Sequence, residues 1–320
     1  MSLHGERCTV IIPCMNREDH LIGSIPQWLE QTYHNMQLVI VDYSSARLLA
    51  DKVFESTNKY GASFLYNYYN AETDVVLLRI DNQQYFNLAH AYNYAVTRIE
   101  STVVSLACAD SCPFDYYLDV CLNMLEENCL VQIHQGLFTL NRSLYLKLNG
   151  FQEFGVGWGA EEDDFRQRAH ISGARIVSLP KHLVYQIPNN RQEKEQNRYV
   201  KDIFESARMN HGRFRQYISK FGYKGNYGEP IGQNQPVEFK FMEPNESVCL
   251  NWAQFVKNPD TMPDNVIHHK ELNIYYTKSN MISWQTYAQE NQLEIVKTGS
   301  ILVDENDDLD RILLQAVNYA

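Results

Sequence analysis

The sequence has no long hydrophobic run. A membrane-spanning helix needs about 20 predominantly apolar residues in a row, and no stretch of the 320 residues approaches that length. The first residues are polar, and the apolar run of about six residues that follows is too short for a secretory signal peptide. We therefore expect a cytoplasmic protein, with the inner face of the membrane as the alternative place of action.

Positive charge is also scarce. Lys and Arg number 28 against 39 Asp and Glu, which gives a formal net charge of −11 at pH 7. Proteins that grip nucleic acid through its phosphates carry a basic field, so we exclude nucleic acid as a partner. A small anionic ligand is still compatible with this charge, because a helix N-terminus or a metal ion can bind it locally.

Paired cysteine motifs are missing. The chain has seven cysteines, an odd number, and their spacing does not repeat. Cys108 and Cys112 lie close together, but no second such pair follows, so we expect no structural zinc. Free buried thiols in a reducing compartment are the simpler interpretation.

Apolar runs separated by helical patterns fill the N-terminal part of the chain. Hydrophobic residues make up 44% of the sequence, enough for a large core. Short apolar runs without strict alternation predict strands at 9–12, 37–45, 74–82 and 102–110, and helical spacing predicts helices between them, including 85–99. This order predicts an α/β fold with a mostly parallel, Rossmann-like sheet that helices cover on both faces.

Three aspartates, Asp42, Asp81 and Asp110, lie at the predicted carboxyl ends of strands. Ligands of such sheets bind at this edge. The aspartates are therefore the first indication of a binding site.

The alternation breaks after residue 110. Residues 222–236 contain four glycines and two prolines and resemble a linker. We predict one domain over 1–222 and a small α/β appendage over 230–320, whose role the residues do not indicate. Within the appendage we expect strands near 237–241, 272–277 and 293–297 and helices near 282–291 and 306–318. Residues 191–221 mix basic and aromatic side chains, which indicates either an amphipathic helix against the core or a surface for an anionic acceptor or a membrane.

An acidic run follows an aromatic, glycine-rich loop in "FGVGWGAEEDDFRQR", residues 154–168. Acidic residues in the first turn of a helix complement its dipole, and Glu162–Arg166 and Asp164–Arg168 have the spacing of helical ion pairs. This structural interpretation leaves the Gly-Trp-Gly before the acids unexplained. The alternative is that the loop holds a catalytic base beside a sugar.

Several stretches together resemble the GT-A nucleotide-sugar glycosyltransferases, both the large inverting family of polysaccharide synthases and the β-1,4-galactosyltransferase-like group. The resemblance covers residues 8 to 198. Its most specific part is "NGFQEFGVGWGAEEDDFRQRAHISG", and weaker parts are "VIIPCMNRED", "VIVDYSS", "FNLAHAYNYAV" and "ACADSCP". It implies a GT-A fold, a nucleotide-sugar donor and a glycan acceptor.

The resemblance also implies roles for individual residues. Glu162 corresponds to the base that deprotonates the acceptor hydroxyl in an inverting transfer. Glu161 and Asp163 would orient the acceptor, and Trp158 would offer a flat face to a sugar ring. The residues expected at the donor are Pro13, Asn16, Asp42, Tyr43, Asp81, Asn93 and Asp110.

Asp110 would also hold the Mn²⁺ or Mg²⁺ that stabilises the leaving diphosphate. Three positions depart from the family pattern: Cys108 replaces the first Asp of Asp-x-Asp, Tyr43 replaces the second Asp of "DDGS", and Gln186 replaces a metal-binding His. The expected metal site is therefore incomplete. Either Asp110 alone shares the ion with the diphosphate, or metal binding is weak, or Lys and Arg side chains replace the metal.

Two functions remain at this stage. The first is an inverting hexosyltransferase that uses a nucleotide-linked sugar, with uridine as the expected nucleoside and galactose or N-acetylgalactosamine as a weak preference, in bacterial surface polysaccharide synthesis. The second is a degenerate GT-A domain that binds or scaffolds glycans without catalysis. Cys108, Tyr43 and Gln186 motivate the second, and nucleotide binding separates the two.

Overall fold

The structure is a computed structural model, and it consists of two compact units, Met1–Phe239 and Lys240–Ala320. It describes residues 5–133, 136–155, 158–188, 195, 197–200, 202–226, 229–233, 248–259, 261–263, 266–277 and 284–303. None of the helices within these residues is long and apolar enough to cross a membrane.

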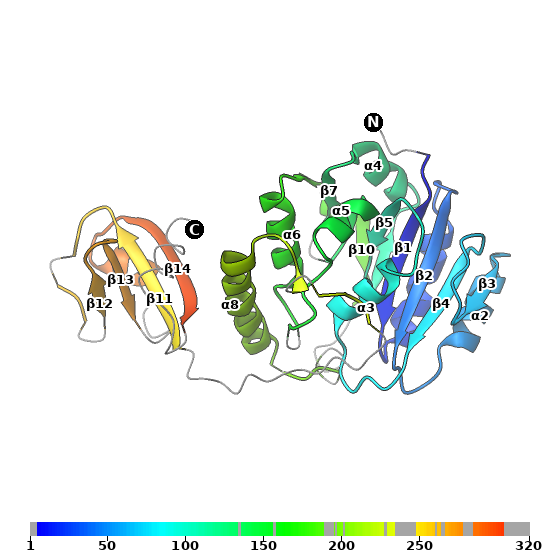
Figure 1. The fold of residues 1–320 in the computed structure, drawn as a ribbon, viewed down its shortest axis with the longest axis horizontal. Helices are drawn as coiled ribbons and strands as arrows, with labels where there is room; N and C mark the ends of the chain where they lie inside the picture. The colour runs from blue at the N-terminus through cyan, green and yellow to red at the C-terminus, as the bar shows by residue number, and fades with distance from the viewer. Residues whose placement is uncertain are drawn as a thin grey trace. The chain divides into compact units, whose positions relative to one another are not determined.

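A sheet of eight strands forms the centre of the first unit (Figure 1). Its order is β3 (Phe64–Tyr66), β4 (Val75–Ile80), β2 (Met36–Tyr43), β1 (Cys8–Cys14), β5 (Val103–Leu106), β8 (Phe138–Asn141), β7 (Cys129–Gln132) and β9 (Arg175–Ser178). The first five strands pair in parallel, whereas β8 is antiparallel to both of its neighbours. The predicted mostly parallel α/β sheet is confirmed.

Helices cover both faces of this sheet, because its central strands are apolar on both sides. One core cluster joins the sheet to α1 (Glu18–Leu29), α2 (Ala50–Asn58) and α4 (Tyr117–Met124). The other joins it to α3 (Leu88–Val96), α5 (Arg142–Lys147) and α6 (Glu161–Ile171). The predicted strands and the predicted helix at 85–99 correspond to β1, β2, β4, β5 and α3.

A second, two-stranded sheet lies beyond the end of β5. It pairs β6 (Ser111–Pro113) antiparallel with β10 (Val184–Gln186), which follows the short 3₁₀ helix η1 (Lys181–Leu183). The pairing brings Gln186 opposite Ser111. It thereby joins the segment after residue 180 to the region of Asp110. The long helix α8 (Ile203–Phe221) comes later in the chain, and Asp202 caps its N-terminus.

The segment predicted to be a linker packs against the first unit instead. Asn226 donates its backbone N–H to Gln152 Oε1 at 2.8 Å, and Gly232 donates to Glu153 Oε1 at 2.7 Å. The division between the units falls at 239/240, and so differs from the predicted boundaries 1–222 and 230–320. Composition suggested a linker because glycine and proline are common in one, but here the backbone amides find fixed partners.

The second unit is a small antiparallel sheet with one described helix. Its strand order is β12 (Ile267–His269), β13 (Ile274–Thr277), β11 (Val248–Phe255) and β14 (Ile295–Val303), and its helix is α9 (Trp284–Glu290). β13, α9 and β14 overlap elements expected from the sequence, whereas β11 was not expected. The strand near 237–241 and the helix near 306–318 lie outside the described residues.

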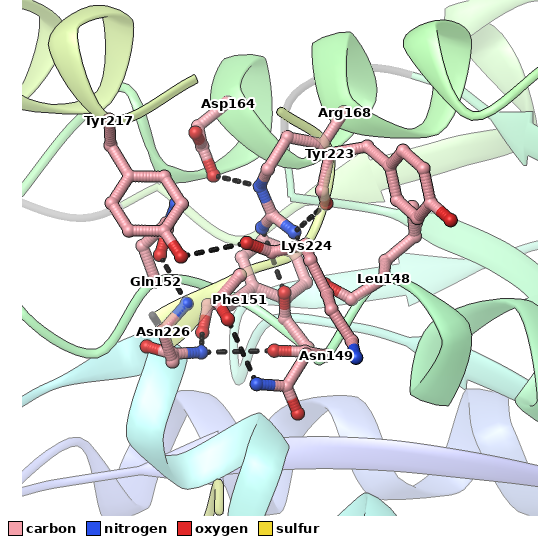
Figure 2. A network of polar contacts seen from close by, with 12 residues as sticks. Leu148, Asn149, Phe151, Gln152, Asp164, Arg168, Tyr217, Tyr223, Lys224 and Asn226 are labelled. Carbon is pink, nitrogen blue, oxygen red and sulfur yellow. Dashed lines mark hydrogen bonds and ion pairs between the residues drawn. The ribbon is translucent and has the colours of Figure 1, made fainter. Parts of the chain in front are cut away.

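A buried ion pair ties α6 to two loops of the first unit (Figure 2). Arg168 donates from Nε to Asp164 Oδ2 at 2.8 Å, and both side chains are almost completely buried. The other guanidinium nitrogens donate to the carbonyl oxygens of Leu148 at 2.9 Å and Gly150 at 2.8 Å, with a longer contact to Tyr223 at 3.4 Å. The predicted Asp164–Arg168 pair is therefore confirmed, and it is an internal anchor of the fold.

We predict that R168M lowers the free energy of unfolding by about 3–5 kcal/mol, because it leaves the buried Asp164 charge and several carbonyls without a partner. Urea denaturation measures the change. R175M is the matched control, since Arg175 pairs with Glu126 at 3.0 Å on the surface and an exposed pair contributes only about 0–1 kcal/mol. Equal losses in the two variants would contradict an anchoring role.

Candidate functional site

A cleft of about 1170 Å³ opens at the carboxyl-terminal edge of the parallel strands. Its walls come from the loop after β1, the turn after β5, the start of α6 and the segment before α8. The lining includes Pro13, Arg17, Asp110, Trp158, Glu162 and Arg198. The fold thus brings the most specific sequence motif and one of the three strand-end aspartates, Asp110, to the same cleft.

The turn into α6 has two residues in the left-handed region, Gly159 at φ 100° and Ala160 at φ 72°. A Cβ added to Gly159 would lie 2.7 Å from that of Ala207 on α8, so only glycine allows this approach. Ser206 of α8 accepts from the Trp158 amide at 3.2 Å and donates to its carbonyl at 2.6 Å. The aromatic loop is therefore held against α8, and α6 begins directly beside the cleft.

The four acids of α6 have four different surroundings. Asp164 belongs to the internal pair with Arg168. Asp163 accepts from Arg166 at 2.6 Å, which replaces the predicted Glu162–Arg166 pair. Glu162 and Asp163 line the cleft, whereas Glu161 is buried behind them and its Oε2 has no hydrogen-bond partner among the described residues.

Burial raises the pKa of three of these acids, one of them Asp164. It raises the pKa of Glu161 from its ordinary 4.5 to about 8, and the neighbouring Glu162 carboxylate adds to the effect. Burial also raises the pKa of Glu162, with a further contribution from Asp163. A carboxylate with a raised pKa is a better proton acceptor, so Glu162 has the chemistry of a general base at the wall of the cleft.

Asp110 is nearly buried and forms an ion pair with Arg17, with Nη2 and Oδ2 3.0 Å apart. Cys108 stands where the Asp-x-Asp pattern has its first Asp. Burial raises the pKa of its thiol to about 12, so the thiol is protonated at neutral pH. In the part of the chain that the structure describes, no three His, Cys, Asp or Glu side chains come together. This donor set does not fit the expected Mn²⁺ or Mg²⁺.

Pro13 lines the cleft, but Asn16 of the same loop is engaged with other segments. Its Nδ2 donates to Asn197 Oδ1 at 2.8 Å, and its Oδ1 accepts from the Ala46 amide at 2.7 Å. It faces a second hollow of about 220 Å³ that Ser45 also lines. Asn16 therefore fixes the loop's shape.

Besides Asn16, three residues expected at the donor, Asp42, Tyr43 and Asp81, are also absent from the cleft lining. Arg79 pairs with both Asp42 at 2.5 Å and Asp81 at 2.6 Å. Tyr43 is fully buried, and its hydroxyl forms a hydrogen bond of 2.8 Å with His90 Nδ1. The end of β2 is thus closed by internal partners. Direct contacts of Asp42, Tyr43 and Asp81 with a nucleoside remain a prediction that this arrangement does not favour.

Asn93 is fully buried and uses its whole side-chain amide inside the protein. It donates to Phe151 O at 2.9 Å and Glu153 Oε1 at 2.7 Å, and it accepts from Tyr145 Oη at 2.6 Å and from the Phe151 amide at 2.9 Å. These bonds fix the loop that leads to Trp158. The geometry therefore gives Asn93 a positioning role, where a donor contact was expected.

The cleft lining includes residues that were not among the expected site residues, such as Arg17, Asn197 and Arg198; Arg198 belongs to the basic and aromatic stretch 191–221. Asn197 donates to Met15 O at 2.9 Å, and so holds the segment before α8 against the loop after β1. Arg198 is 7% exposed, with its guanidinium carbon 5.2 Å from the centre of the Trp158 ring. The incomplete metal site was the sequence signal that could have pointed to these residues, because it indicated that Lys or Arg side chains near Asp110 could replace the metal.

We predict that E161Q weakens the pH dependence of stability. Between pH 4.5 and about 8 the folded chain keeps a proton on Glu161 that the unfolded chain releases, so stability falls as the pH rises through this window. Removing the titration reduces that fall by up to about 1.4 kcal/mol per pH unit. Urea denaturation at pH 5 to 8 measures it, with the exposed Glu55 of α2 changed in E55Q as the control. Parallel pH profiles of wild type and E161Q would refute the prediction.

One comparison with known proteins finds a match in the part of the chain that contains α6. Residues 131–191 match the family model described as the N-terminal domain of galactosyltransferase; they include α6 with Glu162. No curated protein matches the chain.

Similar solved structures include the mannosyltransferase PcManGT from Pyrobaculum calidifontis, in complex with GDP-Man and Mn²⁺, at 18% identity and a TM-score of 0.49, covering 60% of this chain and 61% of that one. GalNAc-T7 with UDP, GalNAc and Mn²⁺ follows at 12% identity and 0.48, covering 57% and 44%. TarS of S. aureus has 14% identity and 0.46, covering 67% and 44%.

The matched region thus spans less than two thirds of each of these three chains. The family match contains the start of α6. The sheet has the predicted parallel strands, and their carboxyl-terminal ends lie at the cleft. The resemblance seen in the sequence is thus confirmed for residues 131–191, the part of the chain that holds its most specific motif.

Proposed function

We propose that the cleft transfers a sugar from a nucleoside diphosphate donor to a hydroxyl group of a glycan, with inversion at the anomeric carbon. The observation that carries the proposal is the common position of Glu162, Asp110 and Trp158 in the walls of one cleft. A base with a raised pKa, a strand-end site for the donor and an aromatic platform are the parts that such a transfer needs.

The reaction assigns a separate task to each wall. The acceptor sugar stacks on Trp158, which is 37% exposed. Glu162 takes the proton of the acceptor hydroxyl while that oxygen forms a bond to the anomeric carbon. The bond from this carbon to the diphosphate breaks on the opposite face, and the nucleoside diphosphate leaves with its electron pair. Asp163, held by Arg166, orients the acceptor from the base's side of the cleft.

Glu161 supports the base from behind. At neutral pH its pKa of about 8 leaves it mainly protonated, so Glu162 has a neutral carboxyl group as a neighbour. A second carboxylate at that place would raise the pKa of Glu162 further. Glu161 is thereby a positioning residue, which replaces its expected direct contact with the acceptor.

The finer assignments come from the motifs. We propose a uridine-linked hexose as donor, with galactose or N-acetylgalactosamine preferred, and a bacterial surface polysaccharide as product. The site of action would be the cytoplasmic side of the membrane. The basic and aromatic residues of α8 would contact an anionic acceptor or the membrane surface.

One observation favours the second candidate, a glycan-binding module without catalysis. Tyr43 is buried and Asp42 is paired with Arg79, so the end of β2 offers little to a nucleoside. A module of this kind would bind a glycan at Trp158 without binding a nucleoside diphosphate.

We predict that E162Q lowers the turnover number by about 10² or more, because general-base catalysis contributes about that factor, while affinity for uridine diphosphate (UDP) changes little. Release of UDP from a panel of UDP-sugars with glycan acceptors measures turnover. E55Q on the exposed face of α2 is the matched control. An E162Q variant with normal turnover would remove Glu162 from the mechanism. If the wild type releases no UDP above background from any of the UDP-sugars, the result would favour the module.

A further inference from the structure

Two arginines face the cleft with buried nitrogens that have no hydrogen-bond partner among the described residues. They are Nε of Arg17, in the loop after β1, and Nη1 of Arg198, in the segment before α8. A buried guanidinium nitrogen without a partner is costly. Two such nitrogens, one in the loop after β1 and one in the segment before α8, line the same cleft, which indicates a ligand that supplies hydrogen-bond acceptor oxygens.

The two guanidinium groups are close enough to influence each other. Burial lowers the pKa of Arg198 to about 10, and the positive charge of Arg17 contributes to the lowering. Arg198 nevertheless remains charged at neutral pH. Asp110 pairs with Arg17 at 3.0 Å, and the nearby Glu161 and Glu195 carboxyl groups partly offset the lowering of the Arg198 pKa. These carboxyl groups still leave one buried nitrogen of each arginine without a hydrogen bond in the described part of the chain.

The protein fixes both arginines in place before any ligand arrives. Asn197 accepts from Asn16 Nδ2 at 2.8 Å and donates to Met15 O at 2.9 Å, so the residues next to Arg198 and Arg17 are bonded to each other. The Trp158 ring supports the Arg198 guanidinium at 5.2 Å. Like charges repel, so a structure that holds them together is preorganised for an anion.

We propose that Arg17 and Arg198 bind the diphosphate of the donor and stabilise it as it leaves, in place of a divalent cation. This inference rests on the proposed transfer and identifies what replaces the metal in it. Guanidinium groups give phosphate oxygens paired, charge-assisted hydrogen bonds. Asp110 orients Arg17 through one oxygen and leaves the remaining nitrogens for phosphate.

The role of Asp110 separates this arrangement from a metal site. As a metal ligand, Asp110 would share its carboxylate between Arg17 and the cation, and the neighbouring Cys108 would offer a soft sulfur atom, which is a poor ligand for hard cations. As an arginine partner, Asp110 is a negative charge near the phosphates. Its removal then has opposite effects in the two arrangements.

The test is calorimetric titration of the full chain with UDP and with inorganic pyrophosphate, in EDTA and in Mn²⁺. We expect binding in EDTA that Mn²⁺ does not strengthen. R17M and R198M should each weaken UDP binding about tenfold or more, as expected for lost hydrogen bonds to a charged group, and R198K should retain part of the affinity. D110N should tighten binding in EDTA.

R175M is the control, because Arg175 forms an ion pair of the same length with Glu126 outside the cleft. Binding that requires Mn²⁺ and is lost in D110N would overturn the arginine assignment and leave the proposed transfer standing. Equal binding by wild type, R17M and R198M would overturn it as well. Absence of binding by UDP, GDP, CDP and pyrophosphate in both conditions would overturn the proposed transfer together with it.

Discussion

The buried guanidinium of Arg168 is the interaction on which the rest of the site depends. A charge inside a protein is tolerated only with a partner and a full set of hydrogen bonds, and Arg168 finds these in Asp164 and in carbonyls of two loops. The requirement joins α6, the loop at 148–152 and the segment at 223–226 into one body. The wall with Glu162 and Trp158 is built on that body, so the shape of the cleft depends on an ion pair that does not line it.

Much of the fold could be predicted because its signals are local. The runs at 9–12, 37–45, 74–82 and 102–110 are apolar on both sides, as strands between two helical layers must be, and each forms a strand of the central sheet. The acidic run after Gly-Trp-Gly begins a helix at the cleft, as its composition and motif indicated. That Glu162 lines the cleft could likewise be inferred, because the same motif contains the Gly159–Ala160 turn that directs the start of α6 toward the cleft.

The remaining parts depend on partners that are distant in the sequence. Asp42 looked like a free strand-end carboxylate, but Arg79 of the neighbouring strand neutralises it. Asn93 looked like a donor ligand, but the loop at 151–153 uses its amide. Arg198 meets the loop of Arg17 only because Asn197 bonds to Met15. Such pairings follow from the packing of elements, which no local pattern encodes.

The buried carboxyl group of Glu161 makes the charge of the cleft wall a function of pH. Near neutrality the acidic helix carries fewer negative charges than its four carboxyl groups suggest, because one of them keeps its proton. Above about pH 8 the same wall gains a full negative charge a few residues from the ligand, without any movement of the backbone. The pKa of one buried carboxyl group thus links the charge of this cleft wall to the pH.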